Sequence, residues 1–196
     1  ARTVRNRVDA VVFFGIGGSY LGGKVLFDVQ CGAFWNLKST EERNGYPKAF
    51  FAGNNVDSHT LSGLIQFLKN DSKTKKNYTV MGVVISKSGS TIEPMSNYMI
   101  LQEAMNDAGI ALETIAVTDP HEETEKETLL HHMARHAGWP IFFVPDGIGV
   151  VYASRILKAP LPERVAGFDL SSNLIEKAAE KAYSLYFFGS KPGVAE

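Results

Sequence analysis

The sequence has little that would suit an exported, membrane-spanning or nucleic-acid-binding protein. One cysteine, Cys31, occurs among 196 residues, so no disulfide can form within the chain. Apolar runs such as Val11–Phe14 are far shorter than the ~20 residues that cross a bilayer. The 20 basic and 21 acidic residues leave a net charge of -1, which creates no strong field for a nucleic-acid backbone. We therefore expect a cytoplasmic protein with neither nucleic acid nor membrane as a partner.

What is present is the composition of a globular domain, with 44% hydrophobic and 21% charged residues. Short apolar runs alternate with segments of helical period, which is typical of parallel strands joined by crossover helices. The expected strands are Val8–Phe14, Ala49–Ala52, Thr79–Ile85, Thr114–Val117 and Ile141–Val144. The expected helices are Ser19–Gln30, Ser58–Leu68, Ile92–Ala108, Glu122–Ala137, Val151–Lys158 and Leu170–Leu185. The pattern predicts an α/β fold, a three-layer α/β/α sandwich around a five-stranded parallel sheet.

The helix expected at Ile92–Ala108 has the best-defined ends. Ser90 or Thr91 can cap its start, and Pro94 falls in its first turn. Gly109 can close it in a left-handed conformation. The polar stretches 36–48 and 69–77 lack regular apolar spacing, which predicts surface loops or a short helix with a loop.

A glycine cluster, Gly15–Gly23, follows the first expected strand. In a doubly wound sheet this is where the ligand crevice lies, and glycines let backbone N–H groups approach a ligand. The helix that begins near Ser19 directs its positive dipole end to the same place, which favours an anion such as phosphate. A tight strand-to-helix turn without a ligand is the alternative reading.

Two nucleotide-binding motifs do not fit this cluster. The dinucleotide fingerprint needs a third glycine where Tyr20 stands, and the second strand ends in Gly53–Asn55 rather than in an acidic residue. The segment Gly18–Lys24 has the spacing of a nucleoside-triphosphate loop, but Val25 follows where a magnesium-binding hydroxyl is needed. Nucleotide binding is therefore a further alternative function for this chain, and magnesium-dependent ATP binding would reveal it.

The third expected strand leads into a loop rich in hydroxyl groups. Residues 86–91 contain Ser86, Lys87, Ser88, Gly89, Ser90 and Thr91 at a strand-to-helix junction. One helix cap needs only one hydroxyl, whereas a phosphate offers several acceptor oxygens to hydroxyls and to helix N-terminal N–H groups. We interpret this loop as the strongest candidate phosphate site in the sequence.

The two loops together resemble a known family. The segments Gly15–Ser19 and Ser86–Pro94 resemble glucose-6-phosphate isomerase in its first sugar-isomerase (SIS) domain, and the likeness continues at 51–55, 117–120, 144–146 and faintly at 165–170. The resemblance implies a SIS domain of flavodoxin-like topology. It implies that Ser86, Lys87, Ser88, Ser90 and Thr91 hold the substrate phosphate, and that Gly17, Gly18 and Ser19 line the sugar.

The sequence departs from the family in two ways. Where the family has an arginine that steadies the enediol intermediate, this chain has Val151, which offers neither donor nor charge. Arg155, four residues on, is a weak candidate substitute. The family also has a second SIS domain that contributes the base glutamate, a ring-opening histidine and a lysine. We expect residues 1–170 to form one SIS domain and residues 171–196 to be a helix and linker toward a second.

The resemblance implies isomerisation of glucose 6-phosphate and fructose 6-phosphate without a metal or organic cofactor. This chain would then be the half that anchors the phosphate, completed by a second SIS domain or by a homodimer. The alternative is a SIS domain that binds a phosphosugar as a sensor and has no catalytic activity. Val151 favours the sensor.

Other candidate residues have a simpler structural interpretation. His131, His132 and His136 share one expected helix, but histidine spacing alone does not predict a metal site. The acidic run Glu122–Glu127 suits the first turn of a helix. Asp119 and Asp146 are either an acid–base pair or caps of the elements that follow, and Cys31 is expected to be a buried thiol.

Overall fold

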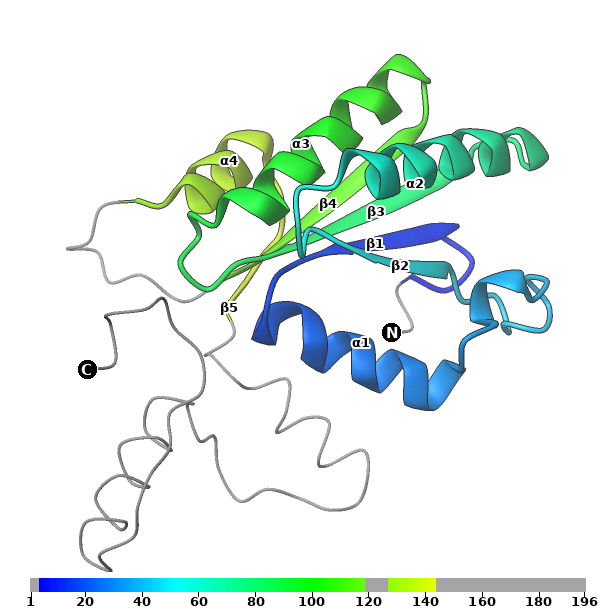
Figure 1. The fold of residues 1–196 in the computed structure, drawn as a ribbon. Coiled ribbons are helices and arrows are strands. Elements are labelled where there is room, and N and C mark those ends of the chain that lie inside the picture. Colours follow the sequence, from blue (N-terminus) through cyan, green and yellow to red (C-terminus); the bar gives the residue numbers. More distant parts are fainter. Residues whose placement is uncertain (1–3, 119–126, 144–196) are drawn as a thin grey trace, which may run out of the picture.

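The protein is a layered α/β structure, described by a computed structural model for residues 4–118 and 127–143 (Figure 1). The five strands of this part are β1 (Ala10–Phe14), β2 (Lys48–Ala52), β3 (Thr79–Ile85), β4 (Ala111–Thr118) and β5 (Ile141–Phe143). The α-helices are α1 (Gly18–Cys31), α2 (Ser58–Asp71), α3 (Ile92–Asp107) and α4 (Leu129–Ala137). Two short 3₁₀ helices, η1 (Trp35–Leu37) and η2 (Ser72–Thr74), lie in the connections. None of these helices is long and apolar enough to cross a membrane.

All strand pairs in the sheet are parallel, in the order β2-β1-β3-β4-β5. This is the strand order of flavodoxin-like folds. Helix α1 covers one face of the sheet, while α2, α3 and α4 cover the other (Figure 1). The expected fold class, a three-layer sandwich with a five-stranded parallel sheet, is confirmed.

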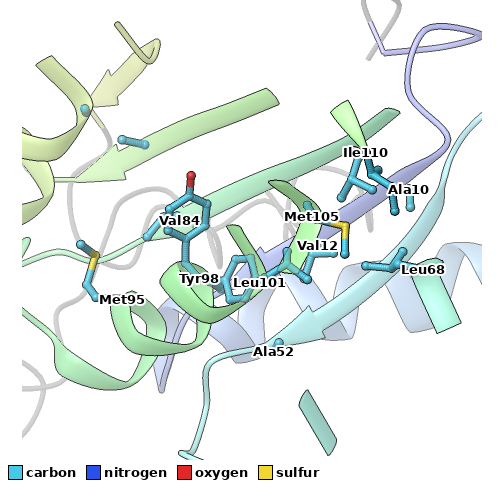
Figure 2. Packing of buried hydrophobic residues seen from close by; sticks show 14 of the residues in the cluster. Ala10, Val12, Ala52, Leu68, Val84, Met95, Tyr98, Leu101, Met105 and Ile110 are labelled. Carbon is cyan, nitrogen blue, oxygen red and sulfur yellow. The ribbon is translucent and has the colours of Figure 1, made fainter. Parts of the chain in front are cut away.

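The main hydrophobic core lies between the sheet and the layer of α2, α3 and α4. Tyr98, Leu101 and Met105 of α3 are fully buried and pack in one cluster with Ala10 and Val12 of β1 (Figure 2). These helix positions are three and four residues apart, so they share the face that meets the sheet. The α1 side is packed differently, because no residue of α1 is buried.

The boundaries of α3 are as the sequence predicts. Thr91 is the N-cap residue and Pro94 lies in the first turn. Gly109 adopts φ +64°, and the N–H groups of Gly109 and Ile110 donate to the carbonyls of Asn106 and Met105, which is a Schellman closure. The prediction that a hydroxyl caps the helix is wrong, because neither Ser90 nor Thr91 makes a side-chain cap hydrogen bond.

Three other expectations need correction. Strand β1 begins at Ala10 rather than Val8, and β4 begins at Ala111 rather than Thr114, because β3 pairs with it along the whole length despite the charged Glu113. Helix α4 begins at Leu129 rather than in the acidic run, because the Thr128 hydroxyl accepts from the His131 N–H and so caps the N-terminus of the helix. Within that run the structure describes Glu127, which precedes the helix.

The prediction of a buried thiol at Cys31 is wrong, because this residue is only partly buried. Cys31 is the last residue of α1 and is only partly covered. This partial burial raises the pKa of the thiol, although Lys38 acts in the opposite direction.

A buried hydrogen bond joins α3 to the sheet. The hydroxyl groups of Tyr98 and Thr114 lie 2.9 Å apart, and a Cβ placed on Gly82 would be 3.1 Å from the Tyr98 ring. Glycine at that position therefore lets the ring lie against β3. Burial raises the pKa of Tyr98 to about 12.

Replacing Tyr98 by phenylalanine leaves the Thr114 hydroxyl without its buried partner. We expect Tyr98→Phe to lower the free energy of unfolding in urea by about 1–2 kcal/mol. The double variant Tyr98→Phe/Thr114→Val removes both hydroxyls and should recover most of that loss. A double variant no more stable than Tyr98→Phe would show that the hydrogen bond is not the cause.

The raised pKa of Tyr98 also predicts a loss of stability at high pH. The unfolded tyrosine ionises at pH ~10, whereas burial keeps the folded residue neutral until about pH 12. The contribution of Tyr98 is therefore complete below pH ~10 and is lost as the pH rises toward 12. Urea unfolding across this range should give a shallower decline for Tyr98→Phe than for the wild type, and parallel curves would contradict the assignment.

Candidate functional site

The candidate site lies where two neighbouring strands end. Strands β1 and β3 pair in parallel, with Phe14 opposite Val84, so the loops that follow them leave the same edge of the sheet. The chain continues from β1 into α1 on one face and from β3 into α3 on the other (Figure 1). Such a topological switch point is where open α/β sheets bind ligands.

The first of these loops, Gly15–Gly17, leads directly into α1. Gly17 has φ +56° and ψ −126° and is the N-cap residue, without a side-chain cap. The N–H groups of Tyr20 and Leu21 donate to the Gly17 carbonyl at 3.1 and 2.8 Å, and the N–H of Ser19 donates to Ile16 at 3.1 Å. Gly17 and Gly18 are exposed and Ser19 is half-buried, so the start of α1 presents backbone rather than bulky side chains.

The segment Gly18–Lys24 is helical, which argues against a nucleotide-binding loop. Helix α1 begins at Gly18, so these residues form its first two turns. The Lys24 ammonium lies 2.6 Å from an Asp28 carboxylate oxygen, one turn further along α1. This i, i+4 pair engages the lysine on the helix surface.

The second loop contains a chain of hydroxyl groups centred on Thr91. The Thr91 hydroxyl lies 3.0 Å from that of Ser86 and 3.3 Å from that of Ser88. The Ser88 hydroxyl accepts in turn from the Ser90 N–H at 3.3 Å. Ser86 is only 2% exposed, whereas Lys87, Ser88 and Ser90 are exposed. The buried Ser86 therefore contacts Thr91 from the protein interior, and Ser88 and Ser90 lie on the solvent-exposed surface of the loop.

Helix α4 braces this hydroxyl-rich loop from the β4 side. The Leu130 N–H, in the first turn of α4, donates to the Gly89 carbonyl at 2.9 Å. Gly89 has φ +61°, and a Cβ added there would lie 2.2 Å from the Thr128 hydroxyl oxygen. The Thr118 hydroxyl donates to the Lys87 carbonyl at 3.3 Å. The shape of the loop is thus set by β4 and α4 as well as by its own sequence.

A third loop, after the edge strand β2, contacts both the glycine loop and the first turn of α3. The Gly15 N–H donates to the Ala52 carbonyl at 3.1 Å. A Cβ built on Gly53 would lie 3.0 Å from the Cα of Pro94 and 3.1 Å from the Gly15 nitrogen. Gly53 therefore contacts both the glycine loop and the first turn of α3, which brings the two candidate loops together. Gly53 is not among the site residues that the sequence predicts, although a glycine followed by two asparagines signals a turn.

The arrangement suits an anion with several acceptor oxygens. Hydroxyls of the second loop and the start of α3 combine donors with the positive end of a helix dipole. Two helix N-termini, those of α1 and α3, follow adjacent strands. Glu93 in the first turn of α3 adds a negative charge that repels an anion. Binding of an anion here therefore depends on the hydroxyl and backbone N–H donors.

Of the other candidates from the sequence, three histidines lie on α4. His132 and His136 have ring centroids 4.3 Å apart on α4, and the described residues contain no cluster of three or more metal-ligating side chains. Instead, His132 and Arg135 lie 3.6 and 3.1 Å from the Glu127 carboxylate. Asp119, Asp146, Val151 and Arg155 lie outside the described residues.

The Gly89 contact predicts an effect of adding one methyl group. Gly89→Ala combines a strained positive φ with a clash against Thr128, whereas Gly109→Ala has a similar φ and open space around the new Cβ. We expect Gly89→Ala to destabilise the protein by about 1–3 kcal/mol more than Gly109→Ala. Urea unfolding of both variants measures this difference, and equal losses would show that Thr128 moves aside without cost.

Comparisons with known proteins show that this chain is similar to part of several proteins named as isomerases. A curated glucose-6-phosphate isomerase from Acetivibrio thermocellus is 33% identical over 200 residues, covering 100% of this chain and 41% of the relative. Relatives of the same name from Clostridium novyi and Streptococcus thermophilus are 32% and 33% identical, each over 94% of this chain and 39% of the relative. The chain thus spans about two fifths of the length of the curated relatives it matches.

Other matches are more limited. A glucose-6-phosphate isomerase structure from Chlamydia trachomatis aligns with 73% of this chain and 23% of that chain, at 21% identity and a TM-score of 0.48. A phosphoheptose isomerase structure from Francisella tularensis aligns with 64% of this chain and 59% of that chain, at 17% identity and a TM-score of 0.32. The model of the glycosyl transferase WecG/TagA/CpsF family matches residues 123–196, which also lie within the alignment to the Acetivibrio relative.

The strand order defines a parallel α/β protein with flavodoxin-like topology. Within that class, the chain is a homologue of the glucose-6-phosphate isomerases, and the resemblance seen in its loop sequences is confirmed.

Proposed function

We propose that this chain is the phosphate-anchoring part of a glucose-6-phosphate isomerase. The observation that carries the proposal is the hydroxyl-rich loop at the start of α3, next to the glycine loop at the start of α1. The similarity to isomerases of that name supplies the reaction, the interconversion of glucose 6-phosphate and fructose 6-phosphate.

In this proposal the sugar phosphate binds across the two loops. Ser88, Ser90 and Thr91 donate hydroxyl hydrogen bonds to phosphate oxygens, together with Lys87 and the N–H groups at the start of α3. Ser86 lies beneath and orients Thr91 through the 3.0 Å contact between their hydroxyls. Gly17, Gly18 and Ser19 line the sugar, because exposed glycines let it approach the backbone.

The chemical step requires groups beyond these loops. Isomerisation moves a proton between C2 and C1 through an enediol, which needs a base and a donor that stabilises the enediolate. The family resemblance assigns the base to a second SIS domain, reached through residues 171–196 after a first domain of residues 1–170. The second domain belongs to a longer protein or is replaced by a partner copy in a homodimer. Arg155 is our candidate for the role that Val151 cannot fill.

The proposal predicts that hydroxyl groups of the second loop dominate the affinity for a sugar phosphate. We expect Ser88→Ala and Thr91→Val each to weaken binding of fructose 6-phosphate about 10-fold or more, because each removes a donor to a charged group. Ser62→Ala, which removes an exposed hydroxyl on α2, is the matched control and should leave affinity unchanged. Titration calorimetry measures all three, and wild-type affinity in Ser88→Ala and Thr91→Val would refute the anchor.

A single experiment distinguishes the isomerase from the phosphosugar sensor. Fructose 6-phosphate is mixed with this chain in heavy water, and NMR follows ligand line broadening and the exchange of protons at C1 for deuterium. Exchange or conversion to glucose 6-phosphate supports an isomerase with its base present. Broadening without exchange supports a binding role, with the base supplied elsewhere or absent. If neither line broadening nor exchange occurs, sugar-phosphate binding by this chain is refuted.

A further inference from the structure

Asn97, on α3, is a buried polar residue that neither the candidate site nor the hydrophobic core accounts for. Only 4% of it is exposed. Its side-chain amide donates to the Glu93 carbonyl at 2.7 Å, one turn earlier in α3, and to the Asn55 carbonyl at 2.9 Å, in the loop after β2. A carboxamide has two N–H donors in fixed geometry, so one group can satisfy both carbonyls at once.

The second of these hydrogen bonds crosses between two segments far apart in the sequence. It ties the middle of the loop between β2 and α2 to α3. At one end of that loop, Gly53 lies against Gly15 and Pro94. At its other end, the Asp57 carboxylate caps α2 by accepting from the His59 N–H at 2.9 Å. Asn97 therefore holds the part of the loop that lies between these two fixed ends.

A pocket lies beside this part of the loop. A cavity of about 140 Å³ is lined by Asn54, Asn55 and Asp57 of the loop, together with Leu61 and Asn97. The pocket is partly open to solvent, so protein atoms do not fill the space beside the loop. The hydrogen bond from the Asn97 amide to the Asn55 carbonyl is the contact that ties the middle of this loop to α3.

We propose that Asn97 is a positioning residue for the candidate phosphate site. By holding Asn55, it keeps Gly53 between Gly15 and Pro94, and so sets the spacing between the glycine loop and the start of α3. This inference rests on the proposed function for its effect on ligand affinity. The coupling between the loops is a property of the fold and can be measured without a ligand.

The test uses variants of this 196-residue chain that separate positioning from general stability. Asn97→Ser keeps a hydroxyl that can bond to the carbonyl one turn earlier, but this side chain is too short to reach Asn55. Asn97→Ala removes both bonds and serves if the serine hydroxyl finds another partner. Tyr98→Phe is the matched control, because it removes a buried hydrogen bond from the same helix on the side of Thr114.

Two readouts are compared at a temperature where every variant is folded. Hydrogen exchange of the Gly15 amide, which donates to Ala52, reports whether the loops have shifted. The dissociation constant for fructose 6-phosphate reports the effect on the site. We expect Asn97→Ser to speed Gly15 exchange and to weaken binding by about 3- to 10-fold, the factor that one ordinary hydrogen bond provides. Tyr98→Phe should change neither readout beyond its effect on global stability.

The possible outcomes separate this inference from the proposed function. If the wild type binds and Asn97→Ser and Asn97→Ala bind equally well, Asn97 has no positioning role. If the wild type does not bind fructose 6-phosphate, the proposed function fails, and faster Gly15 exchange in the Asn97 variants still supports the coupling. Unchanged exchange would overturn it. Equal changes in Tyr98→Phe would reduce the role of Asn97 to stability alone.

Discussion

The candidate site depends on the parallel pairing of β1 with β3. This pairing aligns the ends of the two strands, with Phe14 opposite Val84, and the chain then turns to opposite faces of the sheet. Two helices therefore begin close to one another, and their unpaired N–H groups lie at one edge. A one-residue slip in this register would turn the buried side chains of either strand to the opposite face and would move its loop away from the other.

Around this pairing, the loops at the edge support one another. Gly53 lies between Gly15 and Pro94, and Leu130 of α4 donates to Gly89 of the hydroxyl-rich loop. Each contact comes from a different crossover, so the edge is built by β2, β4 and α4 as well as by the two strands that carry the candidate residues. A preorganised anion site requires such mutual support, because rearranging the donors on binding costs free energy and lowers the affinity of the site for its ligand.

The two faces of the sheet differ in how they are covered by the described residues. Tyr98, Leu101 and Met105 seal the face under α2, α3 and α4, while α1 on the opposite face has no buried residue. Leu21, Val25 and Val29 recur every four residues along α1 and are each more than half exposed. The candidate site lies between a firmly packed helix, α3, and a helix whose own packing in this part of the chain is slight.

The sequence by itself determined the fold class and the two candidate loops. Continuous apolar strands such as Thr79–Ile85 identify a parallel sheet, and the density of hydroxyls in residues 86–91 exceeds what a helix cap needs. Only the tertiary structure decided that the hydroxyl of Thr91, the N-cap residue of α3, contacts Ser86 and Ser88 and makes no side-chain cap hydrogen bond, and that Asn97 reaches Asn55. The hydroxyl contacts depend on the exact path of the loop, and the Asn97–Asn55 contact joins two crossovers and depends on how α3 packs on the sheet. Local periodicity and propensity do not encode either.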